Sequence, residues 1–241
     1  MTIHIQNTEN HADIDALQRQ AESQMNKIVP ISCRAMSYSL LPLKCPYWDN
    51  LHAACNRVVG WSQSLFDDSN RSFYLYGSMR SIGSDGNDVK PHLLELGRYC
   101  ATLYSSLIKV GRDITTDGRF PVVSVETLIR EFDSRRFKNG GREPQFNISS
   151  KIGSKQVTFD GYLDHLANQP VLFIENIGQG ETRGRVRDVL ERLVNPRGRR
   201  RLPTFFSSDH SIPELKGYFG DWLIRQMIAG RCDQVDVRAA A

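Results

Sequence analysis

The sequence lacks the patterns that mark several classes of protein. Its five cysteines are an odd number at wide spacings with no CxxC pair, which argues against a zinc site or a disulfide framework. No apolar run approaches membrane-spanning length, and the amino terminus MTIHIQNTEN lacks the basic and apolar regions of a signal peptide. We therefore expect a cytoplasmic protein with no membrane partner.

The chain also lacks a strong overall charge. A net charge of +4 over 241 residues is mild, so any attraction to nucleic acid must come from where the arginines stand. The hydrophobic content of 40% and charged content of 24% are ordinary for a globular protein. This length can hold one sizeable α/β domain and a small appendage.

What the chain does contain is an alternation of short apolar runs and helical periodicities. The run Val171–Ile174, within PVLFIENIG, is too short for a helix and rich in β-branched and aromatic residues, as in a strand buried on both faces. Strands are expected at 72–76, 120–125, 171–174, 204–208 and 233–237, with helices at 48–66, 92–110, from 126, 162–166, 183–194 and two short ones broken at Gly220. This order predicts an α/β fold with a five-stranded parallel sheet.

Two segments fall outside this alternation. Residues 12–28 carry an apolar stripe at helical spacing, which either packs on the chain's own core or docks a partner protein. Prolines make residues 29–50 a linker, so we expect an N-terminal partner-binding region at 1–50 and the main domain at 51–241. Residues 135–155 are polar and Gly-rich, which predicts a mobile or hairpin-like excursion.

The first strand leads into a glycine-containing stretch that only partly matches a phosphate-binding loop. Aligning GxxxxGK[ST] on Gly77 puts Gly83 where the lysine should stand. Aligning on the next helix instead gives Lys90 the lysine position, with Gly83 and Gly86 inside a lengthened loop. Pro91 suits a first helical turn but cannot supply the hydroxyl that binds Mg²⁺. A plain strand-to-helix loop remains an alternative.

From Tyr76 to Val237 the order of segments resembles the AAA+ ATPases of the bacterial helicase-loader and IstB type, the DnaC-like family. The segments are LYG with KPHL, FPVVSVETLIREF, YLDHLANQPVLFIENIG, LPTFFSSDHSIPEL and FGDWLIRQMIAGRCDQVDV. The resemblance implies a three-layer P-loop AAA+ type domain preceded by a short helical N-terminal region. In the family that region binds a partner, commonly a replicative helicase.

The resemblance also implies ATP and Mg²⁺ as cofactors, at altered catalytic positions. Glu175 can anchor Mg²⁺ through its water shell, but Asn176 stands where a second carboxylate would polarise the attacking water. Asp209 occupies the polar sensor position, where its charge would repel a γ-phosphate. Trp222 replaces the first arginine that completes a neighbour's ATP site, and Arg225 lies one position from the second. We expect weak or absent ATP hydrolysis.

One stretch concentrates positive charge. Eight arginines between residues 183 and 201 face only Asp188 and Glu191, a density that neutralises phosphates. No aromatic residue is interleaved, so base stacking is not expected on this stretch. The alternatives are a solvated helix face or an acidic partner surface. The candidate DNA-binding residues are Arg183, Arg185, Arg187, Arg197, Arg199, Arg200 and Arg201.

These features favour a DNA replication accessory protein that binds a replicative DNA helicase and single-stranded DNA. One alternative is a transposase-accessory ATP-binding protein of IstB type, with a transposase as partner. Another is a non-enzymatic decoy that blocks a host helicase or loader, favoured by the changes at Pro91, Asn176 and Asp209. The sequence leaves a homo-oligomer open.

Overall fold

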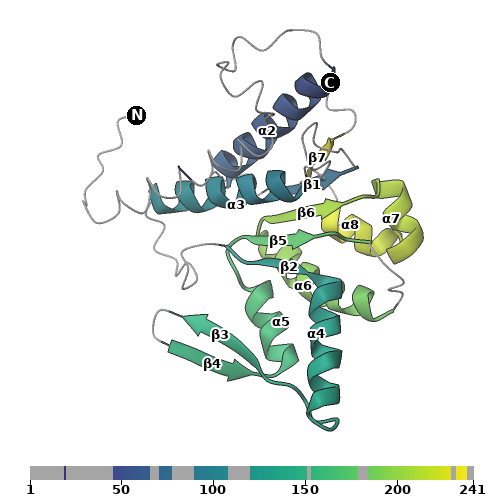
Figure 1. The fold of residues 1–241 in the computed structure, drawn as a ribbon. Helices are drawn as coiled ribbons and strands as arrows, with labels where there is room; N and C mark the ends of the chain where they lie inside the picture. Colours follow the sequence, from purple (N-terminus) through teal and green to yellow (C-terminus); the bar gives the residue numbers. More distant parts are fainter. Residues whose placement is uncertain are drawn as a thin grey trace, which may run out of the picture. The chain divides into compact units, whose positions relative to one another are not determined.

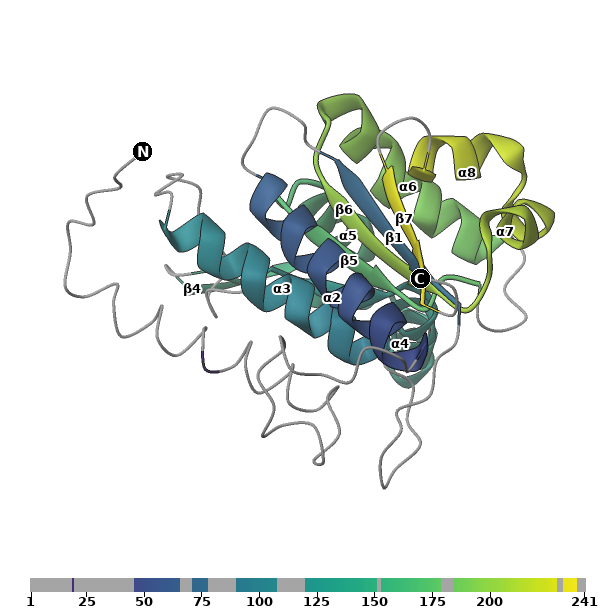
Figure 2. The same cartoon turned by 90° about the horizontal axis from the view of Figure 1, so that it is seen from above.

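A computed structural model describes residues 19, 46–65, 71–77, 90–107, 120–150, 153–178, 184–228 and 232–237 (Figures 1 and 2). Apart from Arg19, the predicted helix at 12–28 lies outside the described residues, and so do Gly83, Gly86 and Arg183. The predicted division of the chain at residue 50 therefore stays a prediction.

The chain forms two compact units. The first comprises residues 1–69, 78–113 and 237–241, and the second comprises 70–77 and 114–236. In the first unit, helix α2 (Pro46–Ser64) packs against helix α3 (Lys90–Leu107) (Figure 2). The Ser62 hydroxyl lies within hydrogen-bond distance of the Val58 carbonyl, at 2.9 Å, and of the Gly97 carbonyl on α3, at 3.2 Å. The predicted inward positions Cys55 and Val58 are buried.

The second unit contains the predicted five-stranded parallel sheet. Its spatial order is β2 (Val122–Ser124), β5 (Leu172–Glu175), β6 (Thr204–Ser208), β1 (Ser72–Tyr76) and β7 (Cys232–Asp236). All four pairings are parallel. The strands lie within about three residues of their predicted ranges, because apolar runs that are buried on both faces stand out in a sequence.

Both faces of this sheet are buried. One face carries Tyr74, Ile174 and Phe206, which belong to a core shared with side chains of α4 (Val125–Lys138), α5 (Phe159–Ala167), α6 (Arg185–Arg200), α7 (Ile212–Phe219) and α8 (Asp221–Ile228). The opposite face carries a row of stacked rings, with 4.9 Å between the centroids of Phe73 and Phe205 and 5.3 Å between those of Phe173 and Phe205.

The predicted excursion at 135–155 contains an antiparallel hairpin of β3 (Phe146–Ser150) and β4 (Gly153–Val157), separate from the main sheet (Figure 1). Phe146 fixes the hairpin to α5, with ring centroids 5.4 Å from Phe159 and 5.3 Å from Tyr162. The Arg135 guanidinium lies 4.9 Å from the centre of the Phe146 ring and donates a hydrogen bond to the Gln145 carbonyl. The hairpin-like interpretation is therefore confirmed.

The main departure from the predicted elements is the length of α6. The sequence predicted a helix that ends at residue 194, before Pro196, but the helix continues through this proline to Arg200. A proline inside a helix removes one backbone hydrogen bond, and tertiary contacts of Arg197 compensate. The helix ends at Arg201, which adopts a left-handed conformation with φ 56°.

Within the described residues, no helix is long and apolar enough to cross a membrane, and no group of three His, Cys, Asp or Glu side chains could hold a metal ion. The three described cysteines, Cys55, Cys100 and Cys232, are free thiols. Burial, reinforced by Cys100, raises the pKa of the Cys55 thiol to about 12, so that it stays protonated and unreactive at neutral pH.

Candidate functional site

Three of the predicted nucleotide-site residues lie at one edge of the sheet. Glu175 is the last residue of β5, Asp209 directly follows β6, and Gly77 directly follows β1, and these strands are neighbours in the sheet. Because the strands are parallel and in register, with Ile174 opposite Phe206 and Tyr76 opposite Ser208, their carboxyl ends coincide. This is the edge at which open α/β sheets bind ligands.

Two predicted phosphate-loop residues, Lys90 and Pro91, are not joined to this edge by the structure. Lys90 and Pro91 begin α3 in the first unit, where Lys90 is buried and Pro91 is exposed. Their part in a common site with Gly77 stays a prediction.

The turn that follows β5 is bound tightly to the end of β6. The Asn176 amide donates to the Ser207 hydroxyl at 3.2 Å, and the Ile177 amide donates to the Ser207 carbonyl at 2.9 Å. The Ser208 hydroxyl donates to the Ile177 carbonyl at 2.5 Å and accepts from the His210 amide at 3.0 Å. Ser207 and Ser208, which precede Asp209, thus position the turn after β5, a role that the sequence did not predict.

His210 extends the same network toward the helices. Its Nε2 lies 3.1 Å from the Gly178 carbonyl, which can only accept, so this nitrogen carries the proton. Its carbonyl accepts a hydrogen bond from the buried Tyr74 hydroxyl on β1. His210 thus connects the turn after β5, the end of β6 and the middle of β1. A single histidine after a strand matches no sequence motif, so the sequence could not predict that His210 would connect these segments.

Asn176 has an unusual backbone conformation and a side chain that cannot act as a base. Its φ is 55°, in the left-handed region where asparagine is the best tolerated residue after glycine. Its amide cannot act as the carboxylate base that water activation requires. Glu175, half-buried at the strand end, fits a Mg²⁺ ion that keeps most of its waters. Among the described residues at this edge, Glu175 is the predicted metal ligand, and the predicted position of the catalytic base holds an amide.

The fold has known counterparts among solved structures, although no protein-family model and no curated protein sequence matches the chain. It is similar to the DnaC helicase loader, with a TM-score of 0.53 and 12% sequence identity, over 83% of this chain and 94% of that chain. It is also similar to DnaI, with a TM-score of 0.50 and 17% identity, over 86% of this chain and 94% of that chain.

The chain has the fold of a DnaC-type helicase loader. This confirms the predicted fold class, an α/β domain with a five-stranded parallel sheet.

Within this DnaC-type fold, the two residues at the predicted finger positions lie on α8. Trp222 is 51% exposed. Arg225 is also exposed and forms an ion pair with Asp221, which Lys216 contacts at 2.8 Å. Lys216, followed by Arg225, holds the pKa of the Asp221 carboxyl below its usual range. Arg225 thus has a partner within its own helix, and its predicted action on a neighbouring subunit stays a prediction.

The arginine-rich stretch divides into paired, exposed and buried side chains. Arg185 pairs with Asp133 at 2.5 Å, Arg187 pairs with Glu191 at 2.8 Å, and Arg200 bonds the Asn168 side chain. Surface pairs of this kind are weak, so a phosphate could compete for these cations. The remaining candidates in the described stretch, Arg199 and Arg201, are exposed.

Arg197 does not belong to this DNA-binding set. The structure buries its side chain to 1% exposure, and the guanidinium donates to the Thr204 hydroxyl at 2.8 Å and to the Gln169 and Pro203 carbonyls at 2.6 Å. Burial lowers the pKa of Arg197 to about 9, so it keeps its charge at neutral pH. A guanidinium that is buried in the interior and hydrogen-bonded to protein acceptors cannot reach a phosphate, and the prediction for Arg197 is wrong.

The carboxyl-terminal end of α4 presents a feature that the sequence interpretation missed. Phe137 is 88% exposed and lies between Arg136 and Lys138, which are also exposed. An aromatic ring among cations was the signal, in the run RRFKNGGR, but the polar composition around it favoured a plain excursion. Cations also stabilise a helix carboxyl terminus, which accounts for the charges but not for the exposed ring.

Proposed function

We propose that the protein is an accessory factor of DNA replication that acts like a helicase loader. It binds a replicative DNA helicase through residues 1–50 and single-stranded DNA through its basic surfaces, with weak or absent ATP hydrolysis. The observation that carries this proposal is the fold shared with the DnaC helicase loader over 94% of that chain. The strand-end arrangement of Gly77, Glu175 and Asp209 supports a retained nucleotide pocket.

The helicase interaction is tested by mixing the purified chain with the replicative DNA helicase of the organism that encodes it. Size-exclusion chromatography should recover a complex, and a variant that lacks residues 1–45 should elute separately from the helicase. Deletion ahead of α2, which begins at Pro46, removes no residue of α2 or α3. A stable complex with a transposase, and none with the helicase, would replace this proposal with the IstB-type function.

Slow hydrolysis is supported by the residue types at the predicted catalytic positions. Asn176 supplies no base, Pro91 supplies no metal-binding hydroxyl, and Trp222 supplies no finger cation. Loss of a finger arginine alone lowers phosphoryl transfer by roughly 10³–10⁵. Glu175 is of a residue type that binds Mg²⁺, and Lys90 is of a type that binds phosphate, although Lys90 is 1% exposed and would have to turn outward to reach one. We therefore expect nucleotide binding without rapid hydrolysis.

Calorimetry with ATP should therefore detect saturable binding that needs Mg²⁺, with little phosphate release in a parallel assay. Lys90→Ala should weaken ATP affinity about tenfold or more, because the side chain is assigned to the phosphates. Lys216→Ala, which removes an exposed lysine on α7, is the matched control and should leave ATP affinity unchanged. Equal affinity of wild type and Lys90→Ala would refute the assignment of Lys90.

A second candidate function is the non-enzymatic decoy, which keeps the fold and blocks a host helicase or loader. The left-handed Asn176 and the exposed Trp222 favour it, since both replace side chains that turnover requires. In the same calorimetric titration a decoy would give no saturable ATP signal, with or without Mg²⁺.

Single-stranded DNA binding is supported at two places in the second unit. Arg199 and Arg201 are exposed near the end of α6, and they can neutralise phosphates without a sequence preference. The arginine-rich stretch at 183–201 has no interleaved aromatic residue, whereas the end of α4 has the exposed ring of Phe137, on which a base can stack.

A further inference from the structure

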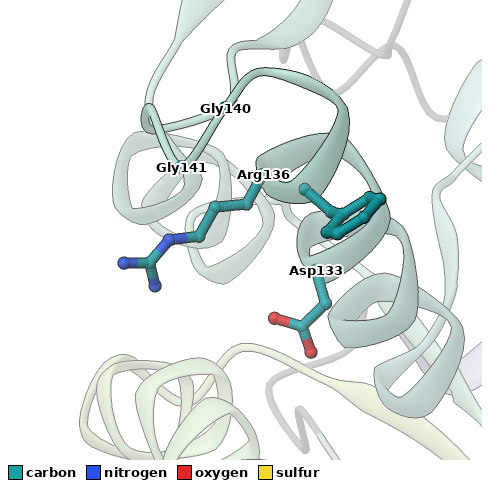
Figure 3. A pocket seen from close by; sticks show the side chains of 5 residues that line it. Asp133, Arg136, Gly140 and Gly141 are labelled. Carbon is teal, nitrogen blue, oxygen red and sulfur yellow. The ribbon is translucent and has the colours of Figure 1, made fainter.

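A pocket of about 450 Å³ lies at the carboxyl-terminal end of α4, lined by Asp133, Arg136, Phe137, Gly140 and Gly141 (Figure 3). The two glycines have φ values of 62° and 86°, and the Gly141 amide donates to the Arg136 carbonyl at 2.9 Å. Their turn closes the helix tightly, and a Cβ atom at either glycine would meet nothing within 4 Å. One wall of the pocket is therefore bare backbone.

The side chains around the pocket offer three kinds of contact. Phe137 presents an aromatic face that is almost entirely exposed, and Arg136 and Lys138 carry exposed cations beside it. Asp133 supplies a carboxylate, one helical turn before Phe137 (Figure 3 shows the carboxylate and the Arg136 guanidinium). A flat ring, a cation and a hydrogen-bond acceptor together match a nucleotide, whose base has a π-face and polar edge and whose backbone is anionic.

Asp133 is held in a defined position. Arg185 donates to its Oδ1 at 2.5 Å, and the same guanidinium lies 4.5 Å from the centre of the Phe132 ring. Among the described residues, no hydrogen bond to the other oxygen, Oδ2, is present, and the side chain is 54% exposed. An ionised carboxylate only accepts hydrogen bonds, so a ligand group that bonds to Oδ2 has to be a donor.

We propose that this pocket holds one unpaired base of the bound single strand, stacked on Phe137, and that Asp133 selects bases that carry an exocyclic amino group. The inference rests on the proposed binding of single-stranded DNA and adds a base preference to it. Cytosine presents an N4 amino donor where uracil and thymine present an O4 acceptor, and aspartate accepts from this amino group. The same carboxylate repels the O4 acceptor.

The test is fluorescence anisotropy of the full chain at neutral pH with labelled oligo(dC) and oligo(dU) of equal length. These strands differ only in the donor or acceptor at the base edge. Wild type should bind oligo(dC) about fivefold more tightly than oligo(dU). Asp133→Asn should bring this ratio close to one, because an amide can both donate and accept, and Phe137→Ala should weaken binding of both strands several-fold.

Asp160→Asn is the matched control, because Asp160 also forms an exposed ion pair with an arginine, Arg192, outside the pocket. It should leave the oligo(dC) to oligo(dU) ratio unchanged. Equal binding of both strands by wild type, or an unaltered ratio in Asp133→Asn, overturns the base pocket and leaves the proposed function in place. Binding of neither strand overturns the single-stranded DNA part of the proposed function together with the pocket.

Discussion

Arg197→Ala is expected to lower the free energy of unfolding by about 3–5 kcal/mol, which is a large share of the stability of a typical domain. The guanidinium is bonded to acceptors on three segments: Leu166 and Ala167, the last residues of α5; the loop carbonyl of Gln169; and Pro203 with Thr204 at the start of β6. Alanine would leave these buried acceptors unpaired and a cavity beside them.

The charge of Arg197 contributes as well as its hydrogen bonds. A cation at the end of α5 interacts favourably with the negative end of the helix dipole. Arg197→Lys keeps the charge but loses the planar fork, so it should recover only part of the stability.

Urea denaturation followed by circular dichroism measures these changes. Arg199→Ala is the matched control, because it removes an exposed arginine from the same helical turn, and it should alter stability by no more than about 0.5 kcal/mol. Equal denaturation midpoints for Arg197→Ala and Arg199→Ala would show that the buried network does not stabilise the fold.

Gly178→Ala is the second substitution with a large expected effect. Gly178 has a φ of 87°, which an L-residue rarely adopts, and a Cβ there would lie 2.9 Å from both His210 Cδ2 and Leu215 Cδ2. We expect a loss of about 2–4 kcal/mol in the free energy of unfolding, from backbone strain and from displacement of His210. Because the turn also carries Glu175, ATP affinity should fall with stability.

Gly217→Ala, in the same part of the fold, is expected to raise the free energy of unfolding. Gly217 lies within α7, and a Cβ there would meet nothing within 4 Å. Alanine should stabilise this helix by about 0.5–1 kcal/mol. Thermal denaturation of both variants beside wild type checks the pair, and a Gly178→Ala protein as stable as wild type would contradict the packing around the turn.

The strands of the α/β fold could be predicted from the sequence because both faces of the sheet are buried. The run Val171–Ile174 contains no polar residue, so it predicts a central parallel strand directly. The break between α7 and α8 was equally clear at Gly220, which has a φ of 81°. The carboxyl-edge positions of Glu175 and Asp209 followed from strand direction.

The roles of individual arginines could not be predicted in this way. Charge counting treats the arginines between 183 and 201 alike, yet Arg197 is buried, Arg185 is paired with Asp133 fifty-two positions away, and Arg199 is exposed. Partners on α4, α5 and the loop before β5 are remote in sequence, as with Asp133 for Arg185 and Gln169 for Arg197. The continuation of α6 through Pro196 depends on the same remote contacts.

Local residue patterns were therefore sufficient for the strands, their direction and the edge where a ligand would bind, since hydrophobic burial and chain direction act within a few residues. Packing between distant segments decided which polar side chains became structural, as with Ser207, Ser208 and Arg197, and which remained available, as with Phe137. Hydrogen-bond partners and solvent exposure depend on which residues are neighbours in space, and local sequence patterns do not specify those neighbours.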